Sequence, residues 1–390
     1  MKDECEMIEF NSSSNISNEK VHHVTLVLGR GDNFNYTFHK VVSLRTLRLQ
    51  YPQPSPLKDE EFLCDFRKFG SLRAFDAAAR GMKELPSSIG NLKHLRYLNL
   101  YYTLVNQLPD SICSLLNLQT LILNYCRKLE RLPQNMMYLR SLRHLYLLDC
   151  PLIEMPRKIG QLTNLKTLNT FVVGKSTDCS LLAELKCLNL GGELRIKHLE
   201  RVSNPMDAKE ANLVGKQNLS QLQLNWEHSL AERESQGHVE SEAQGNVESD
   251  AQENLEVLPE DLASLVTLKS LKIIGCRKLE SLPEEGLRGL ESLQSLFILF
   301  CFKIASLPAS VQSLTKLQRL NIQFCDELAR RCEKGKGEDW YKIAHIPQVS
   351  VIKVLPCSWV MMAAASIEVS MASDALLVRR FWAVYGFEVI

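Results

Sequence analysis

The stretch Leu95-Arg96-Tyr97-Leu98-Asn99-Leu100 returns twice in similar form, as Leu118-Gln119-Thr120-Leu121-Ile122-Leu123 and Leu142-Arg143-His144-Leu145-Tyr146-Leu147. Leucine holds the first, fourth and sixth positions of each copy, and the middle leucines lie 23 and then 24 residues apart. An apolar residue and a proline follow each copy of this stretch, at Leu108-Pro109, Leu132-Pro133 and Met155-Pro156. The same turn recurs later, at Leu258-Pro259, Leu282-Pro283 and Leu307-Pro308.

A fixed period of about two dozen residues with this leucine pattern is typical of a leucine-rich-repeat solenoid. Side chains alternate across a strand, so Leu118, Leu121 and Leu123 should point inward while Thr120 and Ile122 face out. One repeat buries too few leucines to offset its backbone entropy, and neighbours must therefore stack. We predict an α/β horseshoe with a parallel concave sheet and a mostly irregular or short-helical convex side.

Five of the twelve cysteines occupy one repeated slot, just after a predicted strand (Cys126, Cys150, Cys276, Cys301 and Cys325). We expect buried thiols there that donate weakly to backbone carbonyls, without disulfides. No C-x-x-C is present, so no zinc or other metal site is expected. The first residues lack the apolar core of a signal peptide, and no run approaches the ~20 apolar residues of a membrane span. These features favour a reducing, cytoplasmic location.

The pattern divides the chain into segments. We predict an N-terminal capping segment over 1–42 with one strand in Val21–Leu28, a first repeat array over 43–175, divergent repeats over 176–230 and a second array over 255–332. Strands are expected at Leu185–Leu190 and Leu219–Leu224, with a short convex helix at Asp207–Leu213. Between the arrays, residues 231–254 form an acidic insert with seven acids and one arginine. A C-terminal cap over 333–355 precedes an unassigned tail, 356–390.

The outward strand positions are the candidate binding surface. Aromatic side chains near arginine or aspartate on one rigid face are what protein interfaces contain. Tyrosine also suits strands, however, and some rings could simply pack on each other. The predicted partner-binding residues are Tyr97, Asn99, Tyr101, Tyr102, Ile122, Asn124, Tyr125, His144, Tyr146 and Asp149 in the first array, and Lys272, Phe297, Phe300, Arg319, Asn321 and Phe324 in the second.

The sequence gives little support for nucleotide binding, catalysis or nucleic-acid binding. Gly174-Lys175-Ser176 resembles part of a phosphate loop, but the glycine that the motif requires five positions earlier is Asn169. No histidine sits in a recognisable pairing with a nucleophilic serine or cysteine, so we expect no enzyme. The net charge of +1, from 46 basic and 45 acidic residues, gives no reason to expect nucleic acid as a partner.

Three stretches resemble the leucine-rich-repeat region of plant intracellular disease-resistance proteins of the coiled-coil, nucleotide-binding, leucine-rich-repeat group. Leu190–Ile196 with Asp207–Leu213 and Leu222-x-Leu224-x-Trp226 is similar to that group's mid-array signature. Cys332–Pro347 is similar to its array end, and Phe171-Val172-Val173-Gly174 also fits. The group's coiled coil and nucleotide-binding switch have no counterpart in the sequence, so ADP or ATP would belong to a domain that this chain lacks.

The resemblance implies a non-enzymatic recognition and regulatory solenoid of plant defence. Its expected partners are proteins: a pathogen effector, a guarded host protein or the nucleotide-binding module of a receptor. An adaptor role, such as a substrate receptor of a ubiquitin ligase, is the alternative, although residues 1–42 offer no obvious helical docking box.

Overall fold

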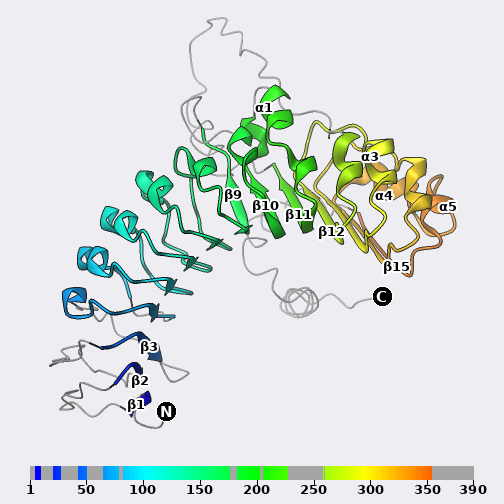
Figure 1. Cartoon of the computed structure of the whole chain (residues 1–390). Helices are drawn as coiled ribbons and strands as arrows, with labels where there is room; N and C mark the ends of the chain where they lie inside the picture. Colours follow the sequence, from blue (N-terminus) through cyan, green and yellow to red (C-terminus); the bar gives the residue numbers. More distant parts are fainter. Residues whose placement is uncertain are drawn as a thin grey trace, which may run out of the picture.

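The computed structural model describes residues 5–9, 21–27, 43–50, 65–78, 82–175, 182–202, 205–226, 258 and 260–353. Over these residues the chain winds into an arc of stacked coils, with strands along the inner side and short helices along the outer side (Figure 1). The predicted acidic insert and the unassigned tail lie outside the described residues.

All described strands pair in parallel with their neighbours. An eight-stranded sheet contains β1 (Cys5–Glu9), β2 (His23–Val27), β3 (Thr46–Gln50), β4 (Ala74–Asp76), β5 (Tyr97–Asn99), β6 (Thr120–Ile122), β7 (His144–Tyr146) and β8 (Thr167–Leu168). A seven-stranded sheet contains β9 (Thr170–Val172), β10 (Gly191–Lys197), β11 (Asn218–Asn225), β12 (Ser270–Ile274), β13 (Ser295–Leu299), β14 (Arg319–Gln323) and β15 (Gln348–Ile352). The predicted parallel concave sheet is confirmed.

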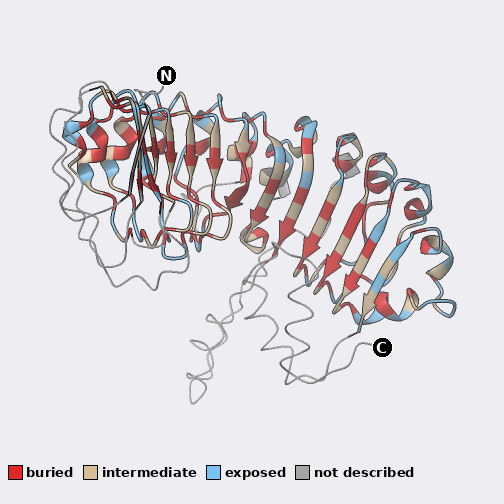
Figure 2. Cartoon of the chain, turned by 90° about the horizontal axis from the view of Figure 1, so that it is seen from below, coloured by how far each residue is buried: buried red, intermediate tan, exposed pale blue. Residues whose placement is uncertain are grey.

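The repeated leucines set the register of this pairing. Leu98 pairs with Phe75 on one side and with Leu121 on the other. In the second sheet, Leu271 pairs with both Leu222 and Leu296. Buried residues therefore recur at the same depth on strand after strand, as Figure 2 shows. A shift of one residue would turn a whole row of leucines to water, so the pattern fixes the register.

The two sheets meet at Asn169, which separates β8 from β9. Its side-chain oxygen accepts a hydrogen bond from the Leu147 amide at 2.6 Å, and its side-chain nitrogen donates to Asn124 Oδ1 at 3.2 Å. The coils continue across this junction between the two sheets. Gly191 N donates to Lys166 O at 2.9 Å, and Arg195 N donates to Asn169 O at 3.0 Å. The arrays form one series, and β11 pairs directly with β12.

The convex side is built from short helices, as predicted. The 3-10 turns are η1 (Phe66–Lys68), η2 (Ser87–Asn91), η3 (Asp110–Ser114), η4 (Gln134–Tyr138), η5 (Ile159–Gln161), η6 (Leu182–Leu185), η7 (Leu199–Arg201), η8 (Leu213–Gly215), η9 (Glu260–Ser264) and η10 (Ala309–Ser313). The α-helices are α1 (Pro205–Glu210), α3 (Glu284–Arg288), α4 (Asp326–Arg331) and α5 (Trp340–Ile343).

Proline begins many of these convex helices. Pro86, Pro109, Pro133, Pro283 and Pro308 are the residues immediately before η2, η3, η4, α3 and η10. Their fixed φ and missing N–H suit a position at which no backbone donor is needed. This explains why the Leu-Pro turn recurs with the repeat.

One predicted strand is wrong. The pattern Leu185-x-x-Leu188-x-Leu190 precedes the strand, which is β10 (Gly191–Lys197). The pairing of β10 with β11 shifts register between Gly192 and Glu193, and Gly192 has a positive φ of 78°. The shift leaves Ser220 of β11 without a partner in the register, and the inward positions of β10 are Leu194 and Ile196, both fully buried.

The cysteine slot behaves as predicted. Cys126, Cys150, Cys276, Cys301 and Cys325 are buried free thiols. The Cys126 thiol donates to Leu100 O at 3.1 Å, and the Cys150 thiol donates to Leu123 O at 2.9 Å. These two thiols therefore satisfy a carbonyl of the preceding coil at the point where the strand has ended.

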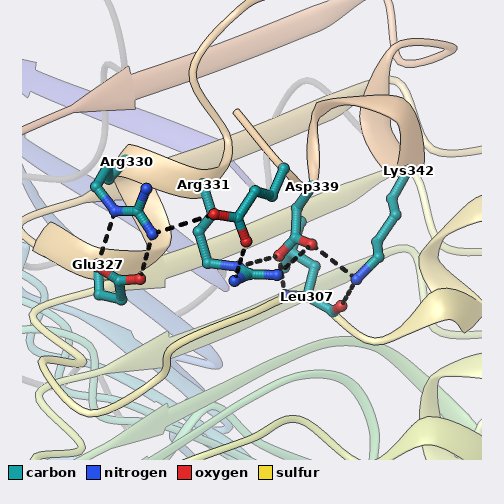
Figure 3. Close-up of polar contacts among 7 residues, drawn as sticks. Leu307, Glu327, Arg330, Arg331, Asp339 and Lys342 are labelled. Atoms are coloured by element: carbon teal, nitrogen blue, oxygen red, sulfur yellow. Dashed lines mark hydrogen bonds and ion pairs between the residues drawn. The ribbon is translucent and has the colours of Figure 1, made fainter. Parts of the chain in front are cut away.

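The last described coil is closed by a polar cluster (Figure 3). The side chain of Asp339 is 1 % exposed and accepts hydrogen bonds from Arg331 at 3.2 Å and from the Leu307 amide at 3.0 Å. Lys342 Nζ lies 2.9 Å from Asp339 Oδ1 and also donates to Leu307 O. Burial alone would raise the pKa of Asp339, but these donors lower it overall. The cluster joins the cap, α4 and the preceding coil.

Candidate functional site

A shallow depression lies on the concave face of the first sheet. Tyr97 and Asn99 of β5, Thr120 and Ile122 of β6, and His144 and Tyr146 of β7 alternate with buried leucines and therefore project from this face. Together with Tyr101 and Asn124 they line a hollow of about 430 Å³. We call these eight residues, with the adjoining Tyr102 and Tyr125, the tyrosine surface.

The rings at one end of the tyrosine surface pack on each other. The centroids of Tyr101 and Tyr125 are 5.4 Å apart in an edge-to-face arrangement, and those of Tyr102 and Tyr125 are 6.5 Å apart. Tyr101 nevertheless keeps 42 % of its surface exposed. The rings thus pack on each other, as the alternative interpretation of the sequence expected. This packing also holds the exposed ring of Tyr101 in place, so that binding a partner costs little further entropy.

Polar side chains hold the strand ends beneath these rings. Asn99 Oδ1 accepts from the Tyr101 amide at 2.9 Å, and Asn99 Nδ2 donates to Asp76 Oδ1 at 3.0 Å. Asn124 Oδ1 accepts from the Leu148 amide at 2.7 Å. Asn99 and Asn124 therefore already stabilise the strand ends, in addition to facing the hollow.

The surroundings of Tyr97 and Tyr125 disfavour ionisation of their phenol groups. Partial burial, followed by the nearby carboxylate of Asp76, raises the pKa of Tyr97. Partial burial and the carboxylate of Asp149 raise the pKa of Tyr125 in the same way. The hydroxyl groups of both tyrosines can therefore donate as well as accept hydrogen bonds.

A second aromatic group lies on the concave face of the other sheet. Phe300 and Phe324 stack with centroids 4.6 Å apart, and Lys272 Nζ lies 4.7 Å from the centroid of Phe297. Arg319 donates to Ser295 Oγ at 3.0 Å. Lys272, Phe297, Arg319 and Asn321 lie on β12, β13 and β14, and the two stacked rings follow β13 and β14. These residues form a separate surface, because β8 to β11 lie between them and the tyrosine surface.

The structure places the remaining predicted residue and adds one that the prediction omitted. Asp149 ends the β7 line with a positive φ of 55°, next to buried Cys150 and outside the hollow. Thr120 lines the hollow although it was not among the predicted residues. Its outward position is evident from the alternation in β6, but its small side chain gives no compositional signal of an interface.

The described residues offer no metal centre, since no group of three or more His, Cys, Asp or Glu side chains converges there. Among the same residues, no helix has the length and apolar character needed to cross a bilayer.

Comparison with known proteins agrees with this architecture. Residues 57–274 match the family described as a leucine-rich repeat region. Disease resistance protein RGA2 of Solanum bulbocastanum is 51 % identical over 160 residues, which are 41 % of this chain and 16 % of that protein. A putative disease resistance protein of Arabidopsis thaliana is 45 % identical over 189 residues, which are 48 % of this chain and 13 % of that protein.

A third relative, a putative disease resistance RPP13-like protein of Arabidopsis thaliana, is 52 % identical over 151 residues, which are 38 % of this chain and 14 % of that protein. The chain thus matches only a small part of the length of each relative. The family match, however, extends over more than half of the chain. The protein therefore belongs to the leucine-rich repeat regions, and its repeats are of the kind found in plant disease resistance proteins.

Proposed function

We propose that this chain is the protein-binding recognition region of a plant disease resistance receptor, and that it acts without catalysis. The observation that carries the proposal is the tyrosine surface, where exposed and half-buried rings surround a hollow on a rigid parallel sheet. Its proposed partners are proteins: a pathogen effector, a guarded host protein or the nucleotide-binding module of a receptor.

The composition of the surface supports a protein ligand. Tyrosine offers a large apolar ring with a polar tip, and such residues provide much of the binding energy at protein interfaces. The rings project from neighbouring strands whose leucines are completely buried, so their spacing is set by the sheet. A partner would meet a preorganised surface and lose less conformational entropy on binding.

The proposed location is the cytoplasm. The repeated cysteines are used as thiol donors to backbone carbonyls, and a disulfide would remove those hydrogen bonds. A reducing compartment keeps them as thiols. We further propose that the chain holds no nucleotide or other cofactor, and that ADP or ATP binds to a separate nucleotide-binding domain.

A binding screen tests the proposal. The purified chain is titrated against a panel of candidate effectors and isolated nucleotide-binding modules of disease resistance proteins. For a partner that binds, Tyr101→Ala combined with Tyr125→Ala should weaken affinity at least about tenfold, the effect of losing aromatic hot spots.

Leu116→Ala combined with Tyr138→Ala is the matched control. Both residues are exposed, at 60 % and 48 %, and belong to the convex part of the same repeats. Equal loss of affinity in both double variants, or full binding by the tyrosine variant, would contradict the proposed surface. Nothing in the described residues or in the relatives reported above favours the ubiquitin-ligase alternative.

A further inference from the structure

A row of basic residues runs along the edge at which the strands of the first array begin. One residue before each strand from β3 to β8, the successive coils carry Arg45, Arg73, Arg96, Gln119, Arg143 and Lys166. We call these six positions the basic ladder. Five of the six are cationic, and all five cationic side chains are exposed.

Backbone hydrogen bonds show that the ladder is continuous in space. Arg73 N donates to Arg45 O at 2.7 Å, and Arg96 N donates to Arg73 O at 2.8 Å. Gln119 N then donates to Arg96 O, Arg143 N to Gln119 O and Lys166 N to Arg143 O, at 2.7–2.8 Å. Adjacent positions are therefore one strand spacing apart, about 4.8 Å.

The charge on this edge is not neutralised locally. No aspartate or glutamate occurs in the segments that lead into these strands. Each segment is nine residues long and ends with the first residue of a strand from β4 to β8 (66–74, 89–97, 112–120, 136–144 and 159–167). Exposed Lys68, Lys93 and Arg140 add further positive charge there. None of the five cationic ladder side chains pairs with a carboxylate among the described residues. The edge therefore has a single sign of charge.

The fold does not require these side chains to be basic. The backbone groups of the ladder make the sheet contacts, while the side chains extend into water. A line of like charges about 4.8 Å apart repels itself and weakens the array slightly. Residues that are unfavourable for stability and arranged on one line are expected where a ligand of opposite charge binds.

We propose that the basic ladder binds an acidic segment of a protein partner, which crosses the strands beside the tyrosine surface. This inference rests on the proposed protein-binding function and specifies the chemistry of the partner. Ladder residues Arg96 and Arg143 immediately precede Tyr97 and His144, which line the hollow. One partner can therefore contact both features.

The uncharged position of the basic ladder determines which charge pattern is expected in the partner. Gln119 separates Arg45, Arg73 and Arg96 from Arg143 and Lys166, and it directly precedes Thr120 of the hollow. The complementary segment has two groups of carboxylates that flank an uncharged centre. A nucleic acid fits less well, because the chain has a net charge of +1 and a pI near 7.5, whereas nucleic-acid-binding domains are strongly basic overall.

The test uses the full chain and a fluorescent synthetic peptide in which two glutamate runs flank a neutral Ser-Gly centre. A peptide with glutamine in place of glutamate is the matched probe, and a single-stranded oligonucleotide of equal charge is the competing class. Binding is followed by anisotropy at low salt and again with added salt. Arg96→Glu combined with Arg143→Glu should weaken binding of the glutamate peptide at least about tenfold.

Arg127→Glu combined with Lys128→Glu makes the same change of charge at exposed positions beyond β6 and should alter affinity less than about threefold. The inference is overturned if the glutamate peptide does not bind, if both double variants lose equal affinity, or if the oligonucleotide binds more tightly than the peptide. A protein partner that requires Tyr101 and Tyr125 but binds the Arg96→Glu, Arg143→Glu variant normally would overturn the ladder and leave the proposed function standing.

Discussion

At the scale of single residues, the ends of the strands store backbone strain. Tyr102, Tyr125, Asp149, Phe300 and Phe324 have positive φ values between 55° and 63°, and each precedes Thr103 or a buried cysteine. For a bulky aromatic residue this conformation is unfavourable. The amides of the four aromatic residues complete the sheet, as where Tyr102 N donates to Asn124 O at 2.9 Å. The sharp turn therefore directs the chain from the concave face into the core.

Glycine occupies the same position once, at Gly275, and there it is required. Its φ is 77°, and an added Cβ would lie 2.5 Å from the carbonyl oxygen of Trp226. Gly275→Ala should reduce the free energy of unfolding by about 2–4 kcal/mol, because the backbone must shift. Asp149→Ala, at a position that already has a Cβ, should change it by less than about 1 kcal/mol. Urea unfolding monitored by circular dichroism measures both, and similar small effects would contradict the steric argument.

Lys216 is a buried cation in the middle of the array. It is 1 % exposed, and its ammonium group donates to Leu185 O at 2.8 Å and to Leu188 O at 3.0 Å. Burial lowers the pKa of Lys216 to about 8 from 10.5, although the nearby Cys187 opposes this change. The unfolded chain therefore binds more protons than the folded chain between these two pH values.

Stability associated with Lys216 should consequently rise with pH. Between pH 7 and pH 9.5 the gain is about 2 kcal/mol, since each unit of difference in pKa corresponds to about 1.4 kcal/mol. Other groups titrate in the same range, so the measurement is a difference between the wild-type chain and Lys216→Met. Urea unfolding at both pH values should show this extra gain in the wild-type chain alone. Identical pH dependence of the two proteins would exclude the assignment.

At the scale of elements, the leucine pattern predicts strands well and their ends poorly. Strands around Leu98, Leu121 and Leu145 follow from alternation alone, because every second residue must be buried. The bulge at Gly192 could not be foreseen, since it depends on pairing with β11. Tyrosine at a positive φ, as at Tyr125, contradicts local preference and is imposed by the neighbouring coil.

The candidate site was predictable to a similar degree. Outward positions such as Tyr97 and Tyr146 follow from the strand period, and the structure brings both to one hollow. The separation of Phe297 and Phe324 from that hollow depends on how many strands intervene, which the divergent residues 176–230 obscure. The basic ladder is visible as Leu-Arg pairs, but its continuity depends on the register.

The C-terminal cap depends on one carboxylate. Asp339→Asn leaves Arg331 and Lys342 without their shared partner and should reduce the free energy of unfolding by about 3 kcal/mol. Because the folded pKa of Asp339 is lowered, its contribution is present above the unfolded value near 3.8 and is lost as pH falls through the folded value. The variant should therefore lose less stability than the wild-type chain on acidification.

Denaturant unfolding at neutral and acidic pH measures this difference. Glu338→Gln is the control, because Glu338 pairs with Arg331 but its side chain is 57 % exposed. Its effect should stay below about 1 kcal/mol. If both variants lost the same free energy of unfolding, the buried carboxylate of Asp339 would contribute no more than the exposed carboxylate of Glu338.

At the scale of the whole molecule, each coil contacts its neighbours and the stack behaves as a one-dimensional series. Its regular spacing is interrupted after β11. Leu224 and Leu258 are 34 residues apart, whereas Leu123 and Leu132 are separated by nine. Yet β11 and β12 pair directly over five residue pairs, so the extra chain length leaves the sheet intact.

Deletion of residues 231–254 should therefore preserve the fold. The deletion leaves the two leucines ten positions apart, close to the nine positions between Leu123 and Leu132. Shortening the connection should raise the free energy of unfolding by at most about 1 kcal/mol, through lower loop-closure entropy. Thermal melting of the variant, compared with a Gly/Ser replacement of equal length, measures the change. Loss of the cooperative transition on deletion would contradict this view.

The direct pairing of β11 with β12 also has an evolutionary consequence. Codons can be gained or lost between Trp226 and Leu258, as long as the buried leucines from Leu258 to Leu268 and the hydrophobic residues of both strands are kept. This connection is therefore a suitable insertion site for foreign peptides, epitope tags or protease sites.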